Sequence, residues 1–240
     1  MMKSLLFLSL TICFISNLKA SEDANALVLK ADLKRGLGNI SHSFKVTINN
    51  SNDTKTEVYK VNFNDVNNSL VEQLEPERAK GRKILLKDYD MWLFTPDIKK
   101  PVRISMDQKL TGEVANGDIA NTNYASDYSA KILGTDKLNG TEVYRIELLA
   151  KNKKVTYNKI EYVIKKSDAT PIAATFFAVS GKPLKRAFFQ DYKMIKGAQR
   201  STKMVIQDFL KKDRTSTMVF SNHTPEKFGE SMFNKDRLEF

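Results

Sequence analysis

The chain is poor in the side chains that most enzymes use for catalysis. It has two histidines, His42 and His223, and one cysteine, Cys13. Neither histidine lies in an H-x-x-x-H, H-x-E or H-E-x-x-H pattern, so neither is spaced as a zinc ligand of a hydrolase. The sequence also contains no G-x-S-x-G nucleophile elbow and no phosphate-binding P-loop. We therefore expect a protein that is not an enzyme.

Two pairs of aspartates could in principle hold a cation. Asp88 and Asp90 precede the only tryptophan, and Asp118 and Asp127 lie in a polar stretch that contains glycine. Carboxylate oxygens are the ligands that calcium and magnesium prefer. Aspartates near turns, however, are far more often bonded to the adjacent backbone. We therefore predict no metal site and no cofactor.

The first residues have the layout of a secretory signal peptide. Lys3 gives a positive start, residues 5–15 are apolar, and Ala20 supplies a small residue before a cut. A lipoprotein signal that ends at Cys13 is disfavoured, because Ile12 is bulky and the cut would fall inside the apolar segment. We interpret 1–20 as a signal peptide and 21–240 as one exported domain. No later stretch reaches the roughly 18 apolar residues of a membrane span, so we expect the mature domain to be soluble.

The chain is strongly basic, with 39 Lys and Arg against 28 Asp and Glu, which gives a formal net charge of +11. Loss of Lys3 and Lys19 with the signal peptide leaves +9 (11 − 2). In an exported protein this charge favours an anionic membrane surface, acidic lipid heads or an acidic partner over nucleic acid. A basic surface that only aids solubility explains the charge equally well.

The periodicity of the apolar residues predicts one long antiparallel meander. After a short amphipathic helix at 21–35, apolar and polar residues alternate from residue 43 onward. We count roughly eleven strands joined by short turns. We expect a charged connection at 70–81, a long loop with one helical turn at 111–128, and a short docked helix after residue 224. About eight strands already fill a barrel, so a wider sheet should curve around an internal helix, a second layer or a ligand cavity.

The strand that carries Trp92 is apolar on both faces. Trp92 and Phe94 point to one side, and Met91 and Leu93 point to the other. Both faces must therefore be covered. A plain dry core explains this pattern as well as a ligand cavity does.

Several motifs resemble those of the LolA-like family of outer-membrane lipoprotein-sorting proteins. The segments GRKILLKDYDMWLFTPDIKKPVRIS and LTGEVANGDIANTNYASDYSAKILG carry most of the likeness. The family pattern is a glycine with a basic residue, two leucine-like residues, W-x-aromatic-x-P, an R-I-S strand, a loop with glycine and aspartate, and a D-Y pair. The matching positions are Gly81, Lys83, Leu85, Leu86, Trp92, Phe94, Pro96, Arg103, Ile104, Ser105, Asp118, Asp127 and Tyr128. The likeness covers nearly the whole mature chain, and none of its motifs is catalytic.

The resemblance implies a mainly β fold: a large antiparallel half-open barrel with a few helices that form a lid over a hydrophobic cavity. It implies a periplasmic carrier that binds lipoprotein acyl chains or another lipid and ferries it toward the outer membrane. The partners would be that lipid, an inner-membrane exporter and an outer-membrane acceptor, with no nucleic acid, and we expect a monomer. The alternative is a non-catalytic adaptor that docks onto an exporter of the resistance-nodulation-division type.

Within that fold we expect the Trp92 face to line the cavity and the helix at 21–35 and the loop at 111–128 to cover its mouth. The predicted lining residues are Trp92, Phe94, Val102, Ile104, Met106 and Phe177. The opposite assignment, with Met91 and Leu93 inward, stays open because a one-residue slip exchanges the two faces. The basic hairpin that follows should be exposed at a rim, where its cations would contact lipid heads or a membrane: Lys99, Lys100 and Arg103.

Overall fold

The computed structural model describes residues 23–36, 41–51, 56–65, 68–120, 123–211 and 213–238. The predicted signal peptide lies outside these residues. The main strands are β1 (His42–Asn50), β2 (Thr56–Asp65), β3 (Asn68–Glu75), β4 (Lys83–Lys87), β5 (Asp90–Thr95), β6 (Ile98–Ile104), β9 (Tyr128–Leu138), β10 (Thr141–Ala150), β11 (Lys159–Lys165), β12 (Pro171–Phe177), β13 (Pro183–Ile195), β14 (Ala198–Asp208) and β15 (Thr215–Pro225).

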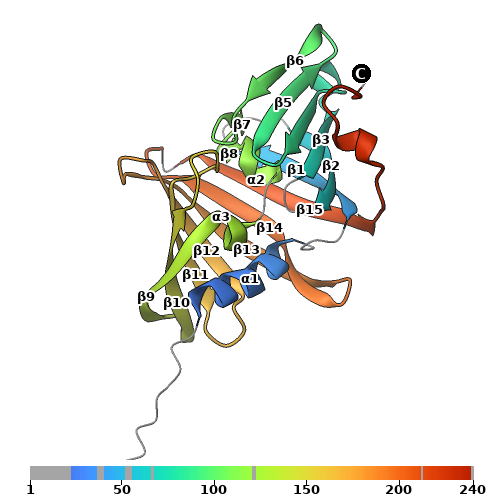
Figure 1. Cartoon of the computed structure of the whole chain (residues 1–240). Helices are drawn as coiled ribbons and strands as arrows, with labels where there is room; N and C mark the ends of the chain where they lie inside the picture. Colours follow the sequence, from blue (N-terminus) through green and yellow to red (C-terminus); the bar gives the residue numbers. More distant parts are fainter. Residues whose placement is uncertain are drawn as a thin grey trace, which may run out of the picture.

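These strands form a single antiparallel sheet of thirteen strands in the order β6-β5-β4-β3-β2-β1-β15-β14-β13-β12-β11-β10-β9. Each half is a plain meander, and the pairing of β1 with β15 joins the two halves (Figure 1). The sheet is not closed on itself, because β6 and β9 are its two edges. The predicted half-open antiparallel sheet is confirmed.

The remaining elements are short. They are the helices α1 (Ala24–Arg35), α2 (Asn116–Ala120) and α3 (Tyr124–Asp127), the 3-10 turns η1 (Glu77–Ala79) and η2 (Glu230–Phe233), and the hairpin of β7 (Lys109–Thr111) with β8 (Val114–Ala115). Asp23 caps the N-terminus of α1, because its carboxylate accepts a hydrogen bond from the Asn25 amide at 2.9 Å. None of the helices in the described residues is long and apolar enough to cross a membrane.

Turn chemistry explains why the meander forms where the sequence predicts it. Asn139 and Gly140 connect β9 to β10 with φ angles of 47° and 81°. Two successive residues of positive φ form a type I′ turn, whose twist matches that of the flanking strands. Lys196 and Gly197 connect β13 to β14 in the same way, with φ angles of 50° and 77°. These tight connections fix the register of long hairpins.

The main core lies on the concave face of the sheet. Residues from both halves contribute to it, and α1 lies over the strands of the β9–β14 half (Figure 1). Leu27, Val28 and Ala31 form the buried stripe of α1, and Ile119 and Ala120 bury α2 in the same cluster. The expected helix and the expected 111–128 segment therefore do lie together over one face, although that segment holds a hairpin and two short helices rather than one loop.

Two segments differ from the structure that the sequence predicts: residues 70–81 and the tail after residue 224. The charged connection expected at 70–81 contains most of β3, because Leu70, Val71 and Gln73 are buried in the sheet and only Glu77–Ala79 form a turn. The tail does not become a helix at residue 224, because β15 continues to Pro225 in pairing with β1.

A second, smaller apolar cluster lies on the other face of the sheet. The tail returns across β3 and β4, where Phe233 packs with Leu70, Leu85 and Phe94. Trp92 packs against this cluster from β5. The tail thus covers the outer face of the strand that is apolar on both sides.

Candidate functional site

The three helices over the concave face, α1 to α3, form a lid that a buried ion pair ties together. Asp32 accepts hydrogen bonds from the Arg35 guanidinium and from the backbone N–H of Ala125 in α3, the latter at 2.7 Å. Burial raises the pKa of Asp32, and the adjacent cation of Arg35 opposes that shift. The Arg35 guanidinium also lies 3.6 Å from the ring centroid of Tyr124. Helices α1 and α3 are therefore held to one another by polar contacts that water does not reach.

A second buried network holds α2. Asp118 accepts hydrogen bonds from the Tyr157 hydroxyl at 2.7 Å, from Lys185 Nζ at 2.8 Å and from the Ala115 amide at 2.8 Å. Lys185 comes from β13 and is only 8% exposed. A burial of this kind requires a partner charge, because an unpaired ammonium in an apolar interior is strongly unfavourable.

The close approach of α2 to the loop between β10 and β11 also depends on Gly117. A Cβ atom at this position would lie 1.9 Å from the Thr156 hydroxyl oxygen. The glycine of the predicted glycine-and-aspartate loop therefore has a packing role, and its neighbour Asp118 has an anchoring role.

Under the lid, the concave face is almost filled. One space under the lid, among the described residues, has a volume of about 50 Å³. Its lining includes Arg35, Phe44, Ile119, Met204 and His223. Ligand pockets for drug-sized molecules have volumes of roughly 300–1,000 Å³, so this space does not hold a lipid chain unless the lid moves.

A larger cleft opens beyond the lid, on the concave face of the β1–β6 half. Its volume is about 440 Å³. The apolar part of its wall consists of Tyr59, Val71, Ile84, Leu93, Ile104 and Leu110. Polar groups complete the wall, and among them Glu57 accepts a 2.5 Å hydrogen bond from the Tyr59 hydroxyl. The cleft combines an apolar floor with polar edges, which suits an amphipathic ligand.

A groove of about 500 Å³ runs beside this cleft, between the end of β6 and the loop that joins β10 to β11. Ile104 lines both spaces. At the groove, Asp90 accepts hydrogen bonds from Arg103 and from Lys154, the latter at 3.0 Å, and the bond from Lys154 is the main cause that lowers the pKa of Asp90. The groove is therefore edged by charged side chains, while the cleft beside it has an apolar floor with polar edges.

The strand register separates residues that the sequence analysis had grouped together. Met91 pairs with Ile104 and Leu93 pairs with Val102, so these four side chains share the concave face. Trp92 pairs with Arg103 and lies on the outer face with Phe94. The structure thus places Trp92 and Phe94 on the face that the tail covers and Leu93 on the face of the cleft. Which of these side chains contact a ligand stays a prediction.

The other predicted lining residues have mixed positions. Ile104 lines both spaces and Met106 is buried beside the groove. Val102 is on the concave face but 43% exposed. Phe177 lies at the end of β12, with Lys159 Nζ 5.1 Å from its ring centroid, and lines none of the spaces described above. Their roles in ligand binding stay predictions.

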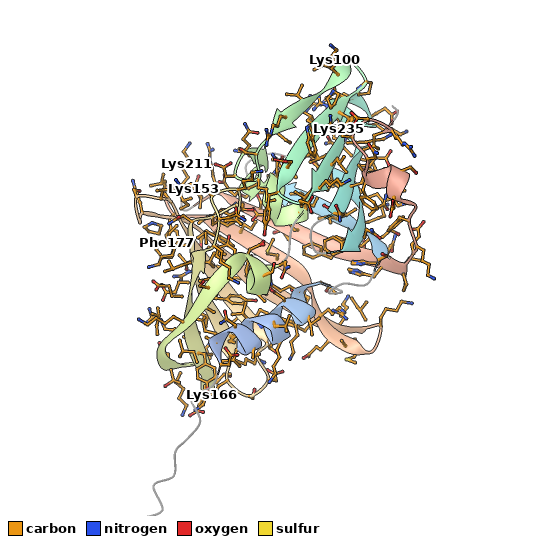
Figure 2. The ribbon with its side chains drawn as sticks, in the orientation of Figure 1. Lys100, Lys153, Lys166, Phe177, Lys211 and Lys235 are labelled. Atoms are coloured by element: carbon orange, nitrogen blue, oxygen red, sulfur yellow. The ribbon has the colours of Figure 1, made fainter. Side chains whose placement is uncertain are left out.

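The three residues predicted to contact lipid head groups do not lie together in one described site. Lys100 is exposed at one extremity of the molecule, in the β6 part of the chain (Figure 2). The side chain of Lys99 lies outside what the structure describes. Arg103 is paired with Asp90 and lines the groove, whereas Lys100 is exposed.

Sequence reasoning missed several residues that the fold places at the site. Lys185 lies on the inward face of β13 with Ala187 and Phe189. A lysine at an otherwise apolar alternating position is the sequence feature that could have identified it as buried. His42 and His223 come together on adjacent strands, with ring centroids 6.2 Å apart and Phe44 stacked on both. Burial, with smaller effects of His42 and Arg200, lowers the pKa of His223 to about 4.

No metal-binding arrangement accompanies these groups. Within the described ranges, no cluster of three or more His, Cys, Asp or Glu side chains is placed to hold an ion. Asp118 and Asp127, which the sequence left as a conceivable cation pair, have protein partners instead, since the Tyr89 hydroxyl donates to Asp127 at 2.9 Å.

The chain is similar to a family model and to several proteins of known structure. The model of a family described as "Uncharacterized protein" matches residues 65–240. The crystal structure of a LolA superfamily protein from Nitrosomonas europaea is 32% identical, with a TM-score of 0.86 over 91% of this chain and 100% of that chain. A domain classed with the outer membrane lipoprotein-sorting proteins, from Vibrio parahaemolyticus, is 20% identical, with a TM-score of 0.74 over 89% of this chain and 97% of that one. None of the curated proteins matches the chain.

Proposed function

Because this chain belongs to the LolA superfamily, we propose that it is a non-catalytic periplasmic carrier. It binds lipoprotein acyl chains, or another lipid, on the concave face of the sheet and ferries them toward the outer membrane. In this proposal an inner-membrane exporter supplies the lipid and an outer-membrane acceptor receives it. The relative from Vibrio parahaemolyticus, which is classed with lipoprotein-sorting proteins, supports the choice of cargo and compartment.

The observation that carries the proposal is the apolar cleft of about 440 Å³ beside a lid that is held by polar contacts. Each methylene moved from water into an apolar site contributes about 0.8 kcal/mol. A chain of about sixteen carbons is therefore stabilised by on the order of 12 kcal/mol when fully shielded. The floor of Val71, Ile84 and Leu93 can shield part of such a chain while its polar head stays near the edge.

The lid supplies the remaining shielding in this proposal. Movement of α1 away from the sheet would uncover Leu27, Val28 and Ala31 together with the strands beneath them, and would join that surface to the cleft. Besides that apolar burial, the polar contacts that would break include those of Asp32 with Ala125, of Lys34 with Asp168, and of Arg200 with the carbonyls of Leu33 and Gly36. A carrier needs such a reversible cover, because it must release what it binds.

The test is to purify the protein from the periplasm of an expression host, extract it with organic solvent and analyse the extract by mass spectrometry. We expect phospholipid or acylated species in near-stoichiometric amount. A Leu93→Asp variant, which puts a charge on the cleft floor, should carry several-fold less lipid. A Leu149→Asp variant is the matched control, since Leu149 is 46% exposed and lines neither the cleft nor the groove. Lipid content no higher than in a mock purification would reject the carrier and favour the adaptor that docks on an exporter.

A further inference from the structure

Three hairpin loops lie next to one another at one end of the β9–β15 half. Lys159 at the start of β11 pairs with Phe177 at the end of β12, and Phe177 pairs with Pro183 at the start of β13. Lys185 of β13 pairs in turn with Asp208 at the end of β14. The loops 151–158, 178–182 and 209–214 therefore share this end of the sheet, and we call the three together the basic rim.

Figure 2 shows Lys153, Lys211 and Phe177 on this same side of the molecule, with Lys166 at the opposite end of the half. The most exposed large apolar side chains of the described residues include two from the rim: Val179 is 85% exposed and Leu210 is 67% exposed. Leu184, between them on β13, is 36% exposed. Apolar side chains therefore protrude from two adjacent loops.

Backbone hydrogen bonds hold these apolar tips outward. In the loop 178–182 the amide of Ala178 donates to the Lys182 carbonyl at 2.9 Å. In the other loop the carboxylate of Asp208 accepts from the amides of Leu210 and Lys211 at 2.6 and 2.7 Å. These bonds fix the backbone at Leu210 and beside Val179, so the exposure of the two side chains is built into the fold.

The charged side chains in the three loops are mostly cations, although the carboxylates of Asp208 and Asp90 lie beside them. Lys151, Lys153 and Lys154 flank them in the first loop, Lys182 in the second, and Lys211 and Arg214 in the third. Asp213 is the only acidic residue that the sequence places in these loops. Protruding aliphatic residues ringed by lysines match a membrane interface with anionic head groups, because the chains bury the tips and the phosphates attract the cations.

The rim also adjoins the route into the concave face. Val179 and Lys153 line the groove of about 500 Å³, which shares Ile104 with the apolar cleft. A bilayer in contact with the rim would therefore face the open end of this groove.

We propose that the basic rim docks on an anionic membrane surface, with Val179 and Leu210 inserted at the level of the lipid head groups. A flat bilayer fits these tips better than an acidic protein does, since Val179 and Leu210 protrude singly from separate loops and form no continuous apolar surface for a partner. The docking itself requires no bound cargo. Only the passage of lipid through the groove rests on the carrier function.

The experiment measures co-sedimentation of the periplasmically purified protein with vesicles of phosphatidylglycerol and phosphatidylcholine at 1:3, at low and at high salt. We expect binding at low salt, weak binding at high salt, and weak binding to pure phosphatidylcholine. Each lysine near such a surface changes affinity roughly fivefold. Lys153→Glu with Lys211→Glu should therefore weaken binding at least about tenfold, and Val179→Asp with Leu210→Asp should do the same without loss of melting temperature, since both side chains are exposed.

Matched controls come from the other end of β13 and from β6. Met194 is 71% exposed, so Met194→Asp with Lys193→Glu introduces the same kinds of change away from the rim and should leave vesicle binding unchanged. Lys100→Glu tests the hairpin at the extremity of the molecule. The proposal would be overturned if both rim double variants bound vesicles as strongly as the wild type. It would also be overturned if Lys100→Glu alone abolished binding. The absence of vesicle binding, even in a protein that carries lipid, would overturn it as well.

Discussion

The guanidinium carbon of Arg35 lies 3.6 Å from the centre of the Tyr124 ring, and the same guanidinium bonds to Asp32. Arg35 ends α1 and Tyr124 begins α3, so this stacked cation joins the two parts of the lid that are far apart in sequence. A cation over an aromatic face contributes about 2 kcal/mol or more when it is desolvated. In the proposed carrier, this contact is one of those that must break when the lid opens.

Pinning the lid should stop exchange of lipid without unfolding the protein. Lys34 Nζ lies 2.6 Å from Asp168, so cysteines at these two positions can be joined by a bismaleimide with a reducible spacer. We expect the linked protein to lose exchange of a fluorescent lipid with vesicles and to recover it after reduction, with an unchanged melting temperature. Normal exchange in the linked protein would mean that α1 does not need to move.

The anchor of α2 should behave as a buried ion pair. Asp118→Asn leaves Lys185 buried without its charged partner, and loss of one member of such a pair costs about 3–5 kcal/mol. Lys185→Met should be costly as well, whereas the double variant should recover much of the loss. Urea unfolding of the four proteins in a double-mutant cycle measures the coupling. Additive effects would show that the two side chains stabilise the fold independently.

Stability should fall in mild acid because of His223. Burial lowers its pKa to about 4 in the folded protein, against 6.5 for the free side chain. The unfolded chain therefore binds the proton first as the pH falls, so stability is unaffected above pH 6.5 and decreases between pH 6.5 and 4. Allowing for solvent screening, we expect a loss of roughly 1–2 kcal/mol over that window.

The matched variant for this prediction is His223→Phe, which keeps an aromatic ring beside Phe44 and removes the titration. Its free energy of unfolding should depend less on pH between 6.5 and 4 than that of the wild type. An identical pH dependence of the two proteins would assign the acid sensitivity to other groups.

A tryptophan on the concave face should report the ligand, and the natural one should not. Leu93 lines the cleft, whereas Trp92 packs on the outer face with Phe233 and Phe94. In a Trp92→Phe background, Leu93→Trp should be quenched by a fatty acid with a bromine label. The wild-type protein should show little quenching at the same occupancy. Strong quenching of Trp92 with none at position 93 would place the ligand on the outer face.

Removal of the tail's anchor should expose the outer face. Phe233 is 4% exposed between Leu70 and Phe94, and Phe→Ala substitutions in cores cost about 3–5 kcal/mol. We expect Phe233→Ala to lower stability by about 3 kcal/mol and to shift Trp92 emission to longer wavelength. Lipid content should stay unchanged, because the cleft lies on the other face. A drop in lipid content would show that the tail supports the site.

The sequence predicts the architecture well because most strands alternate cleanly and most turns carry their own signals. It fails at β3, where Glu72 and Glu75 interrupt the pattern and conceal a strand that is buried through Leu70 and Val71. It fails also at β5, because both faces are apolar and only the tertiary position of the tail decides which face is inside. Asp118 and Lys185 are 67 residues apart in the sequence, and no local sequence pattern predicts a buried ion pair between two such distant residues.

The pairing of β1 with β15 governs the order in which the molecule assembles. Every other neighbouring pair in the thirteen-stranded sheet is a local hairpin, and hairpins form within about 1–10 μs. The β1–β15 seam joins residues that are more than 160 positions apart, for example Asn50 with Ser216. Loop closure makes such a contact slow, and β15 emerges among the last parts of the chain to be made. The two meanders should therefore exist as separate half-sheets until the end, so the seam is where slow folding and exchange of halves between copies would begin.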